Sequence, residues 1–134
     1  MDKYDVINMH FIDICNFDCI YCYANNNQGG VKSQEKWERI IDDIAIYFKE
    51  NNISTGRINL VGGEPLLYKK LPEIIDYICD KNIKVSILTN GYYLNEEFIK
   101  KVLKKDQDEK KEINYMGLSE LMRMSIIFVT FCLN

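Results

Sequence analysis

The sequence predicts an α/β protein built on a parallel sheet, and two observations point to that class. Short apolar runs with β-forming residues alternate with segments whose apolar residues recur at helical spacing. Strands and helices that alternate in this way form parallel sheets with right-handed crossovers. In addition, each of the first three runs is followed by a conspicuous polar or cysteine motif. Because sites in such sheets gather beyond the carboxyl ends of the strands, these motifs are expected to share one site.

The first strand and the first helix are predicted from the amino-terminal third of the chain. Residues 4–14 form a β-rich apolar run that leads into three cysteines, and residues 23–32 have the composition of a loop. Ser33 is a suitable N-cap for a helix that ends near Asn51, because its hydroxyl can accept a hydrogen bond from an unpaired backbone N–H. The apolar stripe of that helix, including a core tryptophan, comprises Trp37, Ile40, Ile41, Ile44 and Phe48.

The next two strands and the helix between them repeat the pattern. Residues 57–61 are expected to form the second strand and residues 84–88 the third. A helix begins near Leu71, with Pro72 in its first turn, where the missing N–H of proline costs nothing. Its apolar face is formed by Ile74, Ile75 and Ile78.

The carboxyl-terminal third is less regular. Asn95 is placed to cap a third helix, and the charged residues 104–112 separate this helix from an expected fourth strand at residues 113–118. Residues 120–134 continue none of these patterns, although residues 126–133 are almost wholly apolar. The whole order amounts to about three and a half βα units.

The composition excludes several broad classes of protein. The 134 residues are 47% hydrophobic and 28% charged, which fits one globular domain and excludes collagen-like and low-complexity chains. A net charge of −3 provides no general basic surface for nucleic acid. No apolar run reaches the length of a membrane span and the first residues lack a signal core, so we expect a cytoplasmic protein without membrane contact.

The five cysteines are the strongest chemical signal. Cys15, Cys19 and Cys22 form a C-x3-C-x2-C loop, and an odd number of cysteines in an apparently cytosolic chain argues against a disulfide framework. Three thiolates this close can hold an iron–sulfur cluster with one open iron, or a structural zinc, which would need a fourth ligand. Chance clustering is the third alternative. Cys79 and Cys132 are interpreted as packing residues, and His10 as a hydrogen-bonding strand residue.

Two further motifs follow the second and third strands. Residues 62–65 read Gly-Gly-Glu-Pro, in which two glycines let the backbone approach a ligand closely and the carboxylate can pair with an ammonium. Alone, these residues would describe a tight turn. Residues 89–91 read Thr-Asn-Gly, which offers Asn90 as a polar contact but is also a common turn sequence.

The cysteine loop after the first strand, followed by Gly-Gly-Glu-Pro after the second, resembles the radical S-adenosylmethionine (SAM) superfamily. In that family three cysteines hold a 4Fe-4S cluster, SAM chelates its open iron, and reductive cleavage of SAM yields a radical that abstracts hydrogen from the substrate. The resemblance implies an incomplete (βα) partial barrel and assigns the cluster to Cys15, Cys19 and Cys22. It assigns SAM binding to Tyr21, Gly62, Gly63, Glu64, Pro65, Asn90 and Ser119. Ser119 could equally be a solvated serine.

A narrower resemblance covers residues 6–119. Residues 8–11 leading to Cys15 and Asn16, and residues 57–66, are similar to viperin and its microbial relatives, which are antiviral radical SAM nucleotide dehydratases. These lyases convert a nucleoside triphosphate to its 3′-deoxy-3′,4′-didehydro product and take electrons from a donor such as flavodoxin or ferredoxin. The resemblance implies that Asn8 and Arg57 help to hold the nucleotide, with Arg in place of the family's Lys. Both could instead be ordinary strand residues. No catalytic side chain beyond the cofactors is implied.

Other features keep two alternatives open. Residues 22–24 read Cys-Tyr-Ala, which also occurs in radical SAM enzymes that modify peptides, so the first alternative is a radical SAM enzyme that modifies a peptide or a small molecule. The second is an inactive iron–sulfur-binding fragment. A full barrel core needs roughly 180–220 residues by analogy with other α/β barrels. We therefore expect residues 1–119 to be the amino-terminal part of a radical SAM core. Residues 120–134 are expected to be a tail from truncation or a frameshift, with a parallel sheet edge left unpaired.

Overall fold

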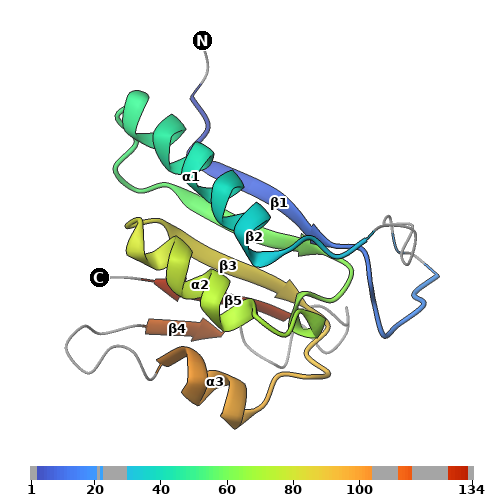
Figure 1. Ribbon diagram of the computed structural model, residues 1–134. Coiled ribbons are helices and arrows are strands. Elements are labelled where there is room, and N and C mark those ends of the chain that lie inside the picture. The colour runs from blue at the N-terminus through green and yellow to red at the C-terminus, as the bar shows by residue number, and fades with distance from the viewer. Residues whose placement is uncertain (1–2, 21, 23–29, 104–111, 116–126, 133–134) are drawn as a thin grey trace.

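The computed structural model describes residues 3–20, 22, 30–103, 112–115 and 127–132, with side chains up to Val102 (Figure 1). Its elements follow one another in the order β1 (Val6–Ile12), α1 (Gln34–Glu50), β2 (Arg57–Gly62), η1 (Pro65–Leu67), α2 (Leu71–Asp80), β3 (Lys84–Thr89), α3 (Glu96–Leu103), β4 (Glu112–Tyr115) and β5 (Ile127–Cys132). The predicted α/β class is confirmed. The sheet is open rather than closed, with β1 and β4 at its edges.

The first three strands form the parallel sheet that the sequence predicted. β1 pairs with β2 and β2 pairs with β3, both in parallel, so that Asn8 lies opposite Asn59 and Asn59 lies opposite Ser86. The arrowheads of these strands in Figure 1 point toward the same end of the molecule. The segments that follow β1, β2 and β3 are therefore gathered at one edge.

The strand beside β3 differs from the prediction. A fourth parallel strand was expected at residues 113–118, but β5 lies between β3 and β4 and runs antiparallel to both. Its sequence, Ile-Phe-Val-Thr-Phe-Cys, is rich in β-branched and aromatic residues, and it forms a five-residue ladder with β3. The edge of β3 that the expected fourth strand would have covered is instead paired by β5, which is part of the apolar stretch at residues 126–133, and β4 lies at the edge of the sheet.

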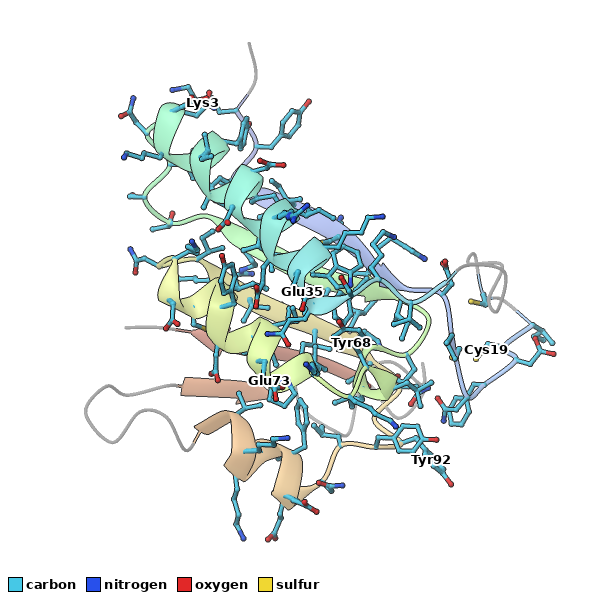
Figure 2. The ribbon with its side chains drawn as sticks, in the orientation of Figure 1. Lys3, Cys19, Glu35, Tyr68, Glu73 and Tyr92 are labelled. Carbon is cyan, nitrogen blue, oxygen red and sulfur yellow. The ribbon has the colours of Figure 1, made fainter. Side chains whose placement is uncertain are left out.

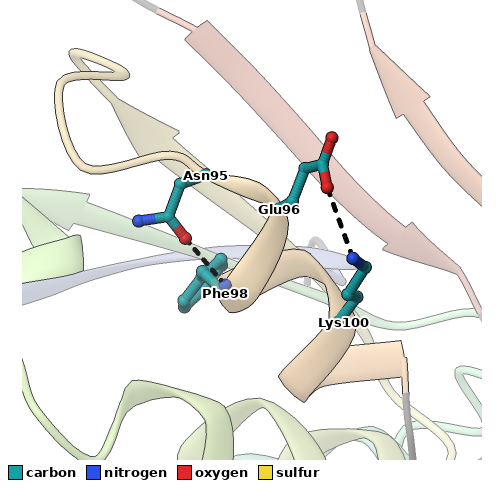
Figure 3. A network of polar contacts seen from close by, with 4 residues as sticks. All are labelled: Asn95, Glu96, Phe98 and Lys100. Carbon is teal, nitrogen blue, oxygen red and sulfur yellow. Dashed lines mark hydrogen bonds and ion pairs between the residues drawn. The ribbon is translucent and has the colours of Figure 1, made fainter.

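The predicted helix caps are confirmed. The hydroxyl of Ser33 accepts a hydrogen bond from Lys36 N at 3.3 Å, and α1 ends at the C-cap Asn51. Asn95 Oδ1 accepts from Phe98 N at 2.9 Å at the start of α3, where an exposed Glu96–Lys100 ion pair spans the next turn (Figure 3). These bonds satisfy backbone donors that a helix start would leave unpaired.

The hydrophobic core lies between the sheet and the helices α1 and α2, which cover one face of it (Figure 1). Trp37 is buried as predicted, and the centroid of its ring lies 5.0 Å from the ring centroid of Phe11 on β1. Cys79 is also buried, as expected of a packing residue, whereas the side chain of Cys132 lies outside the described part. Among the described helices, none has the length and apolar character of a bilayer span.

A surface ion pair joins the two helices that cover the sheet. Asp42 Oδ1 on α1 accepts hydrogen bonds from Lys81 Nζ at 2.7 Å and from Tyr77 Oη at 2.9 Å. The bond from Lys81, and next that from Tyr77, hold the pKa of Asp42 below its usual value. The same bond to Asp42 raises the pKa of Lys81. The contact should therefore stabilise the packing of α2 against α1 only while both groups are charged.

Candidate functional site

The turn after β2 packs directly against the chain that leads from β1 to the cysteines. Gly63 N donates a 2.6 Å hydrogen bond to Ile12 O, and Glu64 N donates a 2.8 Å bond to Ile14 O. A Cβ atom on Gly63 would overlap the carbonyl oxygen of Ile14, and one on Gly62 would overlap that of Ile12. Gly62 also has a φ of 135°, which other residues rarely adopt. The close approach that these glycines allow is made to the protein's own backbone.

Glu64 is a buried carboxylate that joins the ends of β2 and β3. Its side chain is 1% exposed, and Oε1 accepts hydrogen bonds from Thr89 Oγ1 at 2.6 Å and Leu66 N at 3.0 Å. Oε2 accepts from Asn90 N at 2.8 Å. Three donors thus satisfy a group whose burial would otherwise be costly. Thr89, which sequence reasoning did not single out, is signalled only by its position directly before Asn90.

Asn90 connects this buried network to the cysteine loop. Its Nδ2 donates a 2.9 Å hydrogen bond to Asn16 Oδ1, and its Oδ1 accepts from Tyr92 N at 3.0 Å. One residue after Asn16 and two residues after Asn90, the rings of Phe17 and Tyr92 meet edge to face with centroids 5.8 Å apart. Figure 2 shows Tyr92 at the same end of the sheet as Cys19. Asn16 and Phe17 lie within the predicted cysteine loop, but no role had been predicted for them or for Tyr92.

The cysteine loop extends beyond the end of β1 (Figure 2). Cys15 and Cys19 are partly buried free thiols and Cys22 is exposed. Cys15 Sγ accepts a hydrogen bond from Phe17 N at 3.5 Å, and Cys22 N donates to Cys19 O at 3.0 Å, which closes a turn between the second and third cysteine.

The donor set fits an iron–sulfur cluster by its chemistry. Soft thiolate ligands on one short, partly open loop, with a backbone N–H directed at a sulfur, are what such clusters require. Among the described residues no three His, Cys, Asp or Glu side chains are gathered closely enough to hold a metal ion. A cluster held by all three cysteines would require their sulfurs to lie closer together than they do here.

The two residues considered as a fourth zinc ligand, His10 and Cys79, both make other contacts. His10 Nε2 lies 2.5 Å from Asp13 Oδ1, so the hydrogen-bonding role predicted for this histidine is confirmed. Cys79 is buried on α2 in the hydrophobic core. A three-thiolate site is therefore better matched to a cluster with an open iron than to tetrahedral structural zinc.

The residues expected to hold a nucleotide lie on the sheet face opposite α1 and α2. Asn8 is exposed, and its Oδ1 accepts a 2.8 Å hydrogen bond from Asn59 Nδ2 on the neighbouring strand. Arg57 is partly exposed and lies opposite Lys84 in the register of β2 and β3, so two cationic residues share this face. Tyr21 and Ser119, both expected at the SAM site, lie outside the described residues.

This combination of an α/β fold with a cysteine loop after β1 and a Gly-Gly-Glu-Pro turn after β2 defines the class of protein. Residues 9–116 match the Radical SAM superfamily, and the chain belongs to that superfamily. The resemblance stated from the sequence is confirmed, since several similar proteins carry the name S-adenosylmethionine-dependent nucleotide dehydratase.

Individual relatives differ in the activity that their names describe. The chain is 34% identical over 85 residues to the S-adenosylmethionine-dependent nucleotide dehydratase of Selenomonas ruminantium. This match covers 63% of this chain and 29% of the relative. It is 29% identical over 121 residues to the Fe-coproporphyrin III synthase of Methanosarcina barkeri, covering 88% of this chain and 27% of the relative. It is 33% identical over 95 residues to the GTP 3′,8-cyclase of Psychromonas ingrahamii, and this match covers 69% of this chain and 27% of the relative. The chain thus spans less than a third of the length of these relatives.

Proposed function

We propose that this chain binds a 4Fe-4S cluster through Cys15, Cys19 and Cys22, binds SAM beside it, and takes part in radical chemistry on a nucleoside triphosphate. The observation that carries the proposal is the hydrogen-bonded contact between the cysteine loop, the Gly-Gly-Glu-Pro turn and the Thr-Asn-Gly turn at one edge of the sheet. When bound together with SAM, such a cluster supplies one-electron cleavage of SAM and so hydrogen abstraction from a substrate.

The SAM-binding part of the proposal rests on Tyr21, Asn90, Ser119 and residues 62–65. Glu64 places a buried acidic side chain at the joint between β2 and β3, beside the backbone that leads to the cysteines. A buried negative charge favours a nearby cation such as the SAM ammonium more strongly than an exposed one would. Because both carboxylate oxygens already accept from protein donors, its first task is to hold the turn in place.

The nucleotide part of the proposal rests on the sheet face opposite α1 and α2, which is called the open sheet face below. Asn8 and Arg57 are the proposed contacts, and the register adds Lys84 as a second cation beside Arg57. A guanidinium binds phosphate oxygens in a bidentate manner, which suits a triphosphate. An external donor of the flavodoxin or ferredoxin class would supply electrons, and an antiviral role follows from the resemblance to viperin.

A substrate other than a nucleotide is the second candidate. The observation in its favour is the relative named Fe-coproporphyrin III synthase, whose match covers 88% of this chain. The two candidates share the cluster and SAM chemistry and differ only in what the open sheet face accepts.

Anaerobic reconstitution with iron and sulfide tests the proposal. We expect about four iron atoms per chain, and formation of 5′-deoxyadenosine from SAM with a strong reductant. Cys19→Ser should lose the iron, whereas the matched control Cys79→Ala, in the core, should keep it. A colourless chain that binds zinc stoichiometrically after this treatment would exclude both candidates. CTP or UTP should increase the yield of 5′-deoxyadenosine; no response to any nucleoside triphosphate would favour the second candidate.

A further inference from the structure

We propose that Asn16 and Asn90 form a clasp that holds the cysteine loop in position, so that both act as positioning residues for the cluster. This inference rests on the cluster-binding function proposed above. The clasp is the hydrogen bond from Asn90 Nδ2 to Asn16 Oδ1, which is 2.9 Å long and joins residues 74 positions apart in the chain. Asn16 directly follows Cys15, which is the first of the three proposed cluster ligands.

Asn90 is suited to this role because hydrogen bonds fix both its backbone and its side chain. Its backbone N–H donates to Glu64 Oε2 at 2.8 Å, and Glu64 is itself 1% exposed and bonded to Thr89. Its side-chain Oδ1 accepts from Tyr92 N at 3.0 Å, which orients the amide so that Nδ2 faces the cysteine loop. The rigid end of β3 is therefore linked through Asn90 to a loop that extends beyond the sheet.

The neighbouring ring contact supports the same arrangement. Phe17 directly follows Asn16, and Tyr92 lies two residues after Asn90. Their rings meet edge to face at an interplanar angle of 73°. Both rings are substantially exposed, so this contact joins loop to loop rather than loop to core. A polar and an aromatic contact thus act on adjacent residues of the cysteine loop.

The clasp gives Asn90 a positioning role in addition to the contact with SAM proposed above, and the two roles can be tested separately. If Asn90 acts through Asn16, removing either partner should have the same effect, and removing both should add nothing. If Asn90 acts on SAM, its loss should raise the KM for SAM while the loss of Asn16 should not. The clasp should also operate in the iron-free chain, before any cofactor binds.

Hydrogen–deuterium exchange of the iron-free full chain tests the clasp directly. Asn16→Ala and Asn90→Ala should each accelerate exchange in residues 13–20 by about two- to tenfold, the effect expected for one lost hydrogen bond. The double variant should match either single variant. Asn16→Asp retains the acceptor oxygen and should stay near the wild type. Asn95→Ala, which removes the α3 cap on the same connecting segment, is the matched control and should leave this peptide unchanged.

The reconstituted protein provides a second readout. A chelator should remove iron about two- to tenfold faster from Asn16→Ala and Asn90→Ala than from the wild type or Asn95→Ala. Additive effects of the two substitutions, or exchange rates that match the wild type, would overturn the clasp even if a cluster forms normally. Absence of any cluster in the wild type would instead overturn the proposed function, while the exchange experiment would still decide whether the clasp exists.

Discussion

The hydroxyl of Thr89 donates a 2.6 Å hydrogen bond to the buried carboxylate of Glu64, and this bond joins the turn after β2 to the end of β3. Thr89 Oγ1 in turn accepts from Gly91 N at 3.0 Å, so its own proton is available for Glu64. A single side chain therefore connects two of the three motifs at the carboxyl edge of the sheet. Because Glu64 N also contacts the chain leading to Cys15, the network reaches the third motif.

Replacing Thr89 should show how much this network contributes to stability. Thr89→Val preserves the shape of the side chain but removes the donor to Glu64 and the acceptor for Gly91 N. We expect a loss of about 1–3 kcal/mol in the free energy of unfolding, because buried polar groups are left unpaired. Urea denaturation measures this, with Thr89→Ser as the control that retains the hydroxyl. Equal stability of the two variants would contradict the role given to the hydroxyl.

Gly63 should tolerate no side chain. A methyl group there would overlap the carbonyl oxygen of Ile14, which is backbone and cannot rotate away. Gly63→Ala should therefore separate the Gly-Gly-Glu-Pro turn from the cysteine loop, lower the thermal midpoint and reduce iron uptake. Gly30→Ala is the matched control, because nothing lies within 4 Å of the added methyl group. The explanation fails if both variants melt and load iron like the wild type.

Arg57 should affect nucleotide binding more than stability. If its guanidinium binds phosphate on the open sheet face, Arg57→Ala should raise the concentration of CTP or UTP needed to stimulate 5′-deoxyadenosine formation by about tenfold or more. Arg57→Lys keeps the charge and should retain most of the response. Lys36→Ala, on the exposed surface of α1, is the control. Unchanged nucleotide dependence in Arg57→Ala would remove Arg57 from the substrate site.

The Asp42–Lys81 pair should make stability depend on pH at both extremes. The pKa of Asp42 is lowered from its usual 3.8 in the folded state, so its contribution is present above that value and is lost as pH falls through the folded pKa. The pKa of Lys81 is raised from 10.5, so its contribution is present below that value and is lost as pH rises through the folded pKa.

Asp42→Asn tests this pH dependence. The variant should be slightly less stable than the wild type by a constant amount between roughly pH 5 and 9, because both groups stay charged throughout that range. The two should converge as the pH falls below the usual pKa of Asp42. Thermal melts across pH, with Asp43→Asn on the neighbouring exposed position as the control, measure the difference. A gap that persists unchanged in acid would show that charge is not its cause.

The α3 cap should matter more than the ion pair beside it. Asn95→Ala removes the acceptor for Phe98 N and should cost about 0.5–2 kcal/mol in the free energy of unfolding. Lys100→Ala removes only an exposed pair, which water and salt screen, and should have a much smaller effect (Figure 3). Chemical denaturation of the two variants side by side provides the comparison. Equal losses would mean that the cap bond is not formed in solution.

Local sequence patterns were sufficient for most elements of the fold. The caps Ser33 and Asn95 and the apolar stripe with Trp37 all depend on residues within one or two helical turns, and the structure confirms them. The three cysteines and the Gly-Gly-Glu-Pro turn were likewise recognisable, because their spacing lies within short segments. The contacts of Thr89, Asn16 and Tyr92 were not predicted, since a polar or aromatic residue in a short motif has no local pattern that reveals its distant partner.

By itself, the sequence determined the alternation of strands and helices, the family and the residues that are proposed to carry the site's chemistry. Each of these depends on neighbours in the chain. Only the tertiary structure decided that β5, rather than a parallel strand, lies beside β3, and that Gly62 and Gly63 pack against the backbone leading to Cys15. It also decided that Glu64, Thr89, Asn90 and Asn16 form one connected network. Such contacts join residues far apart in the chain, and hydrogen-bond geometry and burial select among the many partners that the local pattern allows.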